Sequence, residues 1–93
     1  MVQYRSVMKT GMKKLKTVSE IGTRVQNIRK GQKVSQETLA GLAGTGARYI
    51  SELERGKETA HIRELLKLLD ALGAGLYIMT AAEAAEWNRL MSI

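Results

Sequence analysis

Apolar residues recur every three or four positions between residues 17 and 73, which is the spacing of amphipathic helices. The first such stretch opens with Thr17 and Glu20, a hydroxyl and a carboxylate at the spacing of a capping box. It ends at Gly31, a residue type that often follows helices. The pattern therefore predicts a helix over residues 18–31. Its apolar face consists of Val18, Ile21, Val25 and Ile28.

Two short helices are predicted next, with a glycine-rich turn at residues 44–46 between them. Ser35 is expected to cap the first helix by accepting hydrogen bonds from free backbone N–H groups. The second helix is expected to span residues 47–55. Apolar residues at helical spacing predict the buried side of both helices, which comprises Leu39, Ala40, Ala43, Ile50 and Leu53.

A fourth helix is expected to be capped by Thr59 and to end at Gly73. Its apolar face is too wide for a helix on the surface, so we expect this helix to form the centre of the core. The apolar positions are Ile62, Leu65, Leu66, Leu68, Leu69 and Leu72.

The segment after Gly73 suits a strand, yet nothing else in the chain offers a second strand to pair with it. We therefore predict that it pairs with its own copy across the twofold axis of a homodimer. The residues of this strand are Leu76, Tyr77, Ile78, Met79 and Thr80. Thr80 and Glu83 then form a second capping box, which opens a final helix carrying Trp87 and Leu90.

The composition argues against several kinds of chemistry. The 93 residues include no cysteine and one histidine, His61, so disulfides and the usual zinc ligand sets cannot be assembled. No nucleophile–base–orienter set and no phosphate loop after a strand is found in the sequence. It also lacks an apolar run of membrane-spanning length and a signal core. We expect a cytoplasmic protein of one domain, without catalytic residues, metal, cofactor or membrane partner.

The net charge of +6 is concentrated at one end of the chain. Five basic side chains and no acidic one lie in residues 1–16, so residues 17–93 have a net charge of only +1. Such an arm is either a solvated tail or a segment that follows phosphate groups. We therefore divide the chain into a basic arm at 1–16, a helical domain at 17–73, and a strand with a terminal helix at 74–93.

The most informative pattern lies between residues 36 and 56. Two short helices that cross steeply need a small residue at their contact, here Ala40, and a glycine of positive φ where the chain reverses, here Gly44. Ile50 and Leu53 then hold the second helix on the first. The positions left on the outward face are Gly46, Ala47, Arg48, Ser51, Glu52 and Arg55. Such a face is suited to the major groove of DNA.

Several side chains of this motif are candidates for contacts with DNA. Arg48 either binds a guanine through O6 and N7 or lies solvated. Gln36, at a helix N-terminus, either binds a phosphate or is an ordinary surface residue. Glu52 accepts from a cytosine amino group, repels wrong sequences, or pairs with a neighbouring arginine. Thr45 and Lys57 complete the predicted DNA-binding set.

With these residues at this spacing, the sequence resembles the phage-repressor-like (Xre/Cro-type) helix-turn-helix proteins over residues 18–73. The resemblance implies that Gln36 binds a phosphate. It also implies that Arg29 of the first helix forms a structural ion pair with Glu54 at the end of the recognition helix.

Within this family, residues 42–57 and 59–73 resemble the HipB-type antitoxins. The resemblance implies a dimer with a strand after the last core helix, in agreement with the strand predicted at residues 76–80. It further implies that the protein represses its own operon together with a HipA-type kinase toxin.

The sequence therefore predicts an all-α, four- to five-helix repressor-like domain with one short C-terminal strand. We expect a homodimeric repressor that binds double-stranded operator DNA on the nucleoid and neutralises a HipA-type kinase toxin. One alternative is a solitary phage-type repressor or a restriction-system controller. The other is a protein-interaction module that inhibits an enzyme without binding DNA. Trp87 either closes the edge of the core or anchors a partner, and His61 is expected to be an ordinary surface residue.

Overall fold

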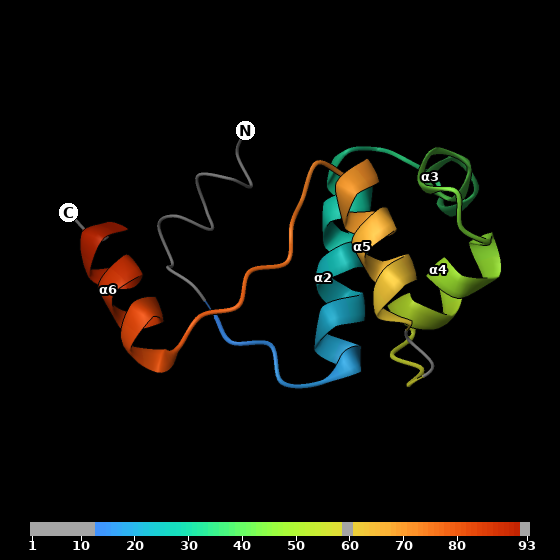
Figure 1. Ribbon diagram of the computed structural model, residues 1–93. Helices are drawn as coiled ribbons and strands as arrows, with labels where there is room; N and C mark the ends of the chain where they lie inside the picture. The colour runs from blue at the N-terminus through green and yellow to red at the C-terminus, as the bar shows by residue number, and fades with distance from the viewer. Residues whose placement is uncertain (1–12, 59–60, 92–93) are drawn as a thin grey trace. The chain divides into compact units, whose positions relative to one another are not determined.

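The computed structural model describes residues 13–58 and 61–91, and the regular structure in these ranges is entirely helical, as the predicted all-α class requires (Figure 1). The chain divides into two units, one of which is Leu15–Leu76, while the other includes the residues from Tyr77 onward. The helices of the described residues are α2 (Val18–Gly31), α3 (Gln36–Ala43), α4 (Ala47–Glu54), α5 (Ile62–Ala71) and α6 (Ala81–Met91).

Helix α2 begins with the predicted capping box. The backbone N–H of Glu20 donates to Oγ1 of Thr17 over 3.1 Å, and Oε1 of Glu20 accepts from the backbone N–H of Thr17 over 3.1 Å. The helix ends at Gly31, as predicted, but the left-handed residue that turns the chain is Lys33, with a φ of 59°. The glycine therefore marks the end of the helix without supplying the positive φ.

Helices α3 and α4 follow the prediction closely. Oγ of Ser35 accepts from the backbone N–H of Thr38 over 3.0 Å, so Ser35 caps α3. Gly44 has the predicted positive φ, at 72°, and Gly46 occupies the N-cap position of α4. Helix α4 ends at Glu54, one residue earlier than predicted, and Arg55 is its C-cap residue.

Helix α5 differs from the prediction at its start and on one face. It begins at Ile62 with His61 in the N-cap position, and the predicted cap, Thr59, lies outside the described residues. Leu68 is fully buried, whereas Ile62 is 59% exposed and Leu66 is 48% exposed. The expectation that the whole apolar face is buried was wrong, because the other helices of this unit cover only one side of α5.

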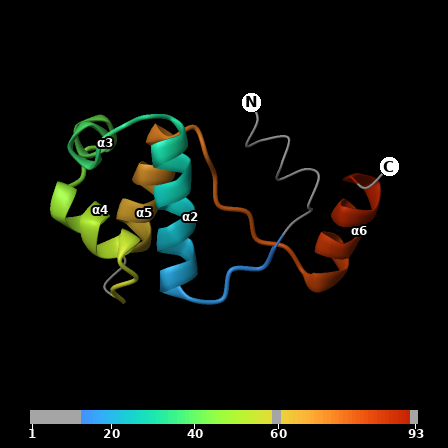
Figure 2. The same ribbon diagram turned by 180° about the vertical axis from the view of Figure 1, so that it is seen from behind.

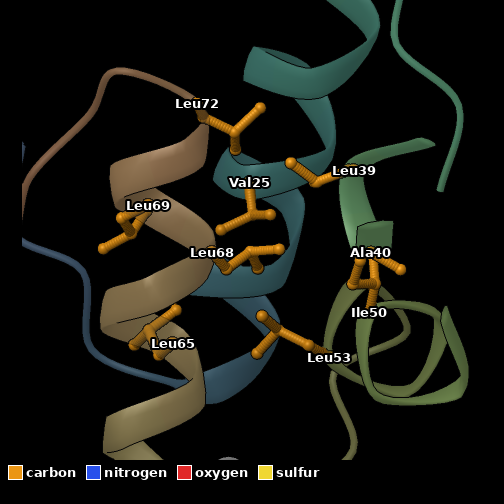
Figure 3. Close-up of a cluster of buried hydrophobic side chains, with 9 residues drawn as sticks. All are labelled: Val25, Leu39, Ala40, Ile50, Leu53, Leu65, Leu68, Leu69 and Leu72. Atoms are coloured by element: carbon orange, nitrogen blue, oxygen red, sulfur yellow. The ribbon is translucent and has the colours of Figure 1, made fainter. Parts of the chain in front are cut away.

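The core of this unit takes side chains from all four of its helices (Figure 3). Helix α4 packs against α2 and α3, and α3 also packs against α5. Helices α2 and α5 lie side by side when viewed from the front and from behind (Figures 1 and 2). The buried apolar residues are Val25, Leu39, Ala40, Ile50, Leu53, Leu65, Leu68, Leu69 and Leu72.

A glycine that the sequence analysis did not single out allows α2 and α4 to approach closely. A Cβ atom placed on Gly22 would lie 1.9 Å from the carbonyl oxygen of Leu53 and 3.1 Å from Cα of Glu54. No real Cβ atom tolerates such a contact with backbone. Gly22 thus determines how near the end of α4 can lie to α2.

In the second unit, α6 begins with the other predicted capping box. The backbone N–H of Glu83 donates to Oγ1 of Thr80 over 3.1 Å, and that of Thr80 donates to the Glu83 carboxylate over 3.0 Å. None of the described residues of α6 is buried, Trp87 included. None of the helices described is both long and apolar enough to span a membrane.

Residues 74–80 have no regular secondary structure in the single chain described. A strand formed by pairing with a second copy becomes regular only when that copy is present. The strand at residues 76–80 and its pairing across a dimer therefore stay predictions. The domain boundaries at residues 16 and 73 are predictions as well.

Candidate nucleic-acid interface

The candidate interface is built on α3, α4 and the three residues that join them. The backbone N–H groups of Gly44 and Thr45 both donate to the carbonyl of Ala40, over 3.0 and 3.1 Å. This closes the turn directly after α3. Ala40 is buried, and Ile50 of α4 is fully buried. Both residues belong to the core on which α3 and α4 pack, and a small residue such as Ala40 allows two short helices to approach closely.

A buried ion pair fixes the inner side of α4. Nε of Arg29 donates to Oε2 of Glu54 over 2.7 Å, and Nη2 donates to Oε1 over 2.9 Å, so the contact is bidentate. The third nitrogen, Nη1, donates to the carbonyl of Val34 over 2.8 Å. The structure thus brings together the two residues that the resemblance paired. They join α2 to the end of the candidate recognition helix.

Two glutamine side chains extend this network. Nε2 of Gln36 donates to Oε1 of Glu54 over 2.9 Å, and Nε2 of Gln26 donates to the same oxygen over 3.3 Å. The Glu54 carboxylate therefore connects α2, α3 and α4. The sequence analysis did not find Gln26, and it expected Gln36 either to bind a phosphate or to be an ordinary surface residue. An amide NH₂ carries two hydrogens, so the bond to Glu54 leaves one hydrogen of Gln36 for a further acceptor.

The network keeps the side chains of Arg29 and Glu54 ionised although both are buried. Burial alone would raise the pKa of Glu54, but the hydrogen bonds from Arg29 and Gln36 outweigh it, and the pKa lies below its usual value. The hydrogen bond to Glu54 likewise raises the pKa of Arg29. The pair is therefore fully ionised at neutral pH and acts as a structural connection.

A second cluster of charges lies on the outer side of α4. Oε2 of Glu52 accepts from Nε of Arg48 over 3.3 Å and from Nζ of Lys57 over 3.0 Å. The hydrogen bond from Lys57, aided by that from Arg48, lowers the pKa of Glu52 against the opposing effect of burial. The Glu52 side chain is only 17% exposed, whereas that of Arg48 is 88% exposed. The Arg48 side chain thus extends into solvent, whereas that of its partner Glu52 is largely covered.

The other predicted DNA-contacting residues differ in their exposure. Gly46 and Arg55 are exposed, while Ala47 and Ser51 are partly covered by neighbouring residues. Thr45 is partly buried, and its hydroxyl oxygen has no hydrogen-bond partner among the described residues. The most accessible basic groups that the two ends of α4 present are therefore those of Arg48, Arg55 and Lys57.

The predicted dimerisation residues are all exposed in the single chain. Ile78 is the most exposed of them, and Tyr77 is nearly as open. They belong to both sides of the boundary between the two units, with Leu76 ending the first. Within the described ranges, His, Asp and Glu side chains form no group of three that could hold a metal ion.

Helices α3 and α4 are joined at a left-handed glycine, and a buried ion pair fixes the inner side of α4. This arrangement defines a helix-turn-helix unit. The chain belongs to the HTH_3 helix-turn-helix family, whose model matches residues 25–77. This range includes α3, the turn, α4 and α5 completely.

A curated relative agrees with this membership, and a solved structure shares the fold. The chain is 44% identical over 71 residues to an uncharacterized HTH-type transcriptional regulator, y4mF, of Sinorhizobium fredii (strain NBRC 101917 / NGR234), covering 76% of this chain and 93% of that protein. A structure described as MDT Protein superposes with a TM-score of 0.70 at 18% identity, covering 75% of this chain and 99% of the other. At 18% identity, the comparison with this solved structure shows a similar fold.

Proposed function

We propose that the protein is a transcription regulator that binds specific DNA sequences, with α4 entering the major groove. One observation carries the proposal: α4 is held from its inner side by the Arg29–Glu54 pair and presents the exposed cation Arg48 on its outer side. A rigid helix with an outward arginine is the element that direct readout of base edges requires. Membership of the helix-turn-helix family supports the same reading.

The candidate contacts divide into two classes. Arg48 is the proposed reader of a base, because a guanidinium can donate to O6 and N7 of guanine together. Gln36 at the N-terminus of α3, and Arg55 and Lys57 after α4, are proposed to bind phosphates, which position the protein without reading sequence. Gln36 would do so with the amide hydrogen that Glu54 does not use.

We also propose that the protein acts as a homodimer on two half-sites. The exposed side chains at residues 76–80 support this, because Ile78 and Tyr77 are apolar or aromatic groups without cover in the single chain described. Proline at position 78 removes a backbone donor that a paired strand would need. The Ile78→Pro variant should therefore sediment as a monomer at a micromolar concentration where the parent is a dimer. An equally dimeric variant contradicts this pairing.

The test of DNA binding begins by selecting duplexes from a randomised library with the parent protein. Arg48→Ala should then cost about 1–3 kcal/mol on the selected duplex and relax the preference at one base pair of each half-site. Gln36→Ala should weaken all duplexes alike. Arg89→Ala is the matched control, since it removes the same charge from α6, outside the helix-turn-helix unit. An unchanged ranking of duplexes after Arg48→Ala excludes Arg48 as the reader.

The finer proposal is that the regulator is a HipB-type antitoxin that represses its own operon and neutralises a HipA-type kinase. The resemblance of residues 42–57 and 59–73 supports it. The test is to co-express the protein with a kinase encoded in the same operon and to measure copurification and kinase activity. A regulator that binds its operator but ignores any such kinase would instead be a solitary repressor or a restriction controller. Kinase inhibition without DNA binding would identify an interaction module.

A further inference from the structure

One oxygen of Glu52 holds two cations that lie on opposite sides of it along the chain. Arg48 precedes Glu52 by one helical turn within α4, and Lys57 follows after the helix has ended. Both contacts are made to Oε2. The Glu52 side chain is 17% exposed, whereas the side chains of Arg48 and Lys57 are 88% and 53% exposed.

The atom through which Arg48 is held matters for what the rest of its guanidinium can do. Glu52 accepts from Nε, at the base of the group, and neither Nη1 nor Nη2 has a partner among the described residues. The two Nη groups form the fork that can donate to O6 and N7 of one guanine. A bond at Nε therefore restrains the arginine without occupying the fork.

Restraining the Arg48 side chain before binding changes the free energy of binding DNA. A free arginine side chain loses rotamer freedom when it is fixed against a base, and that loss reduces the affinity. A side chain already restrained before binding loses less. The same reasoning applies to Lys57, whose ammonium keeps two further hydrogens while one is given to Glu52.

We propose that Glu52 is a positioning residue of the DNA-binding face, which restrains Arg48 through Nε so that its Nη groups meet a guanine in each half-site, and which directs Lys57 toward a neighbouring phosphate. The inference rests on the proposed DNA-binding function. In this arrangement the Glu52 carboxylate makes no base contact of its own. It gives specificity through Arg48.

A double-mutant cycle on the duplex selected by the parent tests this. Glu52→Ala should weaken binding about 3- to 10-fold and reduce the preference for guanine at the position that Arg48 reads. In an Arg48→Ala background, Glu52→Ala should cause no further loss of that preference, because Glu52 acts there through Arg48. Glu52→Gln keeps one acceptor oxygen and should restore part of the parent's preference.

A measurement without DNA separates positioning from general stability. In the free parent, the Nε–H resonance of Arg48 should differ in chemical shift and in exchange with water from that of the Glu52→Ala variant, while both proteins remain fully folded at the temperature of the measurement. Lys57→Ala should reduce the slope of log K against log salt by about 1, the value expected for one lost phosphate contact. It should leave the guanine preference unchanged.

The outcomes distinguish the inference from the function on which it rests. If the parent enriches no duplex, the proposed function fails, and the inference fails with it. If the parent selects a motif and the losses of guanine preference caused by Arg48→Ala and Glu52→Ala are additive, Glu52 contacts DNA independently of Arg48 and the inference alone is overturned. Tighter binding of Glu52→Ala to every duplex would also overturn it, because Glu52 would then act only by repelling phosphate.

Discussion

Glu52 and Glu54 lie two residues apart in the same helix and have opposite surroundings. The Glu54 side chain is 2% exposed and accepts from Arg29, Gln36 and Gln26. The Glu52 side chain is 17% exposed and accepts from Arg48 and Lys57, both of which extend into solvent. The same residue type thus has a structural environment on one face of α4 and a surface environment on the other.

The difference indicates how such a helix can be both fixed and adaptable. A buried charge that loses its partner is costly, because neither water nor another group can replace that partner. An exposed pair adds little stability, because water competes with both members. The inner cluster can therefore set where α4 lies, while the outer cluster leaves the Nη groups of Arg48 open to a ligand.

The largest expected effect is the removal of the inner carboxylate. Glu54→Ala leaves the Arg29 guanidinium buried without its partner and should lower the free energy of unfolding by about 3–5 kcal/mol. Urea denaturation measures this. The matched control is Glu52→Ala, two residues away, which should lower the urea midpoint much less, because its two partners are exposed to water.

A double substitution separates lost pairing from lost packing. Replacing both members, with Arg29→Met and Glu54→Leu, removes the buried charges together and should recover most of the stability lost in Glu54→Ala. If the double variant is as unstable as the single one, the burial of an unpaired charge is not the cause.

The next largest effect is expected at Gly22, where the backbones of α2 and α4 approach each other. Gly22→Ala places a Cβ atom 1.9 Å from the Leu53 carbonyl oxygen, so α2 and α4 must separate, at a cost of about 1–3 kcal/mol. Gly41→Ala is the control, because a Cβ atom there meets nothing within 4 Å and alanine favours a helix. Thermal unfolding of both variants measures the contrast. Equal midpoints would mean that α4 does not depend on the close approach at Gly22.

The features that could be predicted from the sequence are local ones. The capping boxes at Thr17 and Thr80 and the left-handed Gly44 each depend on residues within a few positions of one another. Their chemistry is therefore visible in the chain itself. The pairing of Arg29 with Glu54 spans 25 positions, and only the resemblance to a family suggested it.

The features that were missed depend on how helices meet in space. Gly22 reads as an ordinary glycine in a helix until the carbonyl of Leu53 is found against it. The acceptor of Gln36 lies 18 positions away, and nothing in the motif specifies it. Leu66 fits the apolar pattern of α5 but is half exposed, because a pattern records spacing and does not show which face a neighbouring helix covers.

A smaller effect is expected from the glutamine that connects α3 to the inner carboxylate. Gln36→Ala removes one hydrogen bond to Glu54 while the bidentate contact with Arg29 remains, so stability should fall by about 1 kcal/mol. Urea denaturation measures that loss. Gln36→Glu should be more harmful than alanine, because it places a second carboxylate beside Glu54. A fully stable Gln36→Glu variant would contradict the contact.

The smallest effect, and the one that compares the two carboxylates most directly, is expected from pH. The pKa of Glu54 in the folded protein lies below its usual value, which in an unfolded chain is about 4.3. A carboxylate with a depressed pKa stabilises the fold above the unfolded value, and this contribution is lost as pH falls through the folded pKa. The difference in unfolding free energy between the parent and Glu54→Gln should therefore be constant near neutral pH and shrink below about pH 4. Urea denaturation at steps from neutral pH into that acid range measures it.

The pKa of Glu52 is also lowered, so Glu52→Gln should show a change of the same sign. Because Lys57 and Arg48 are exposed, that change should largely disappear at high salt, where solvent-exposed charges are screened, whereas the change for the buried Glu54 should persist. A difference between the parent and Glu54→Gln that stays constant into acid would mean that the inner carboxylate is not stabilised in its ionised form.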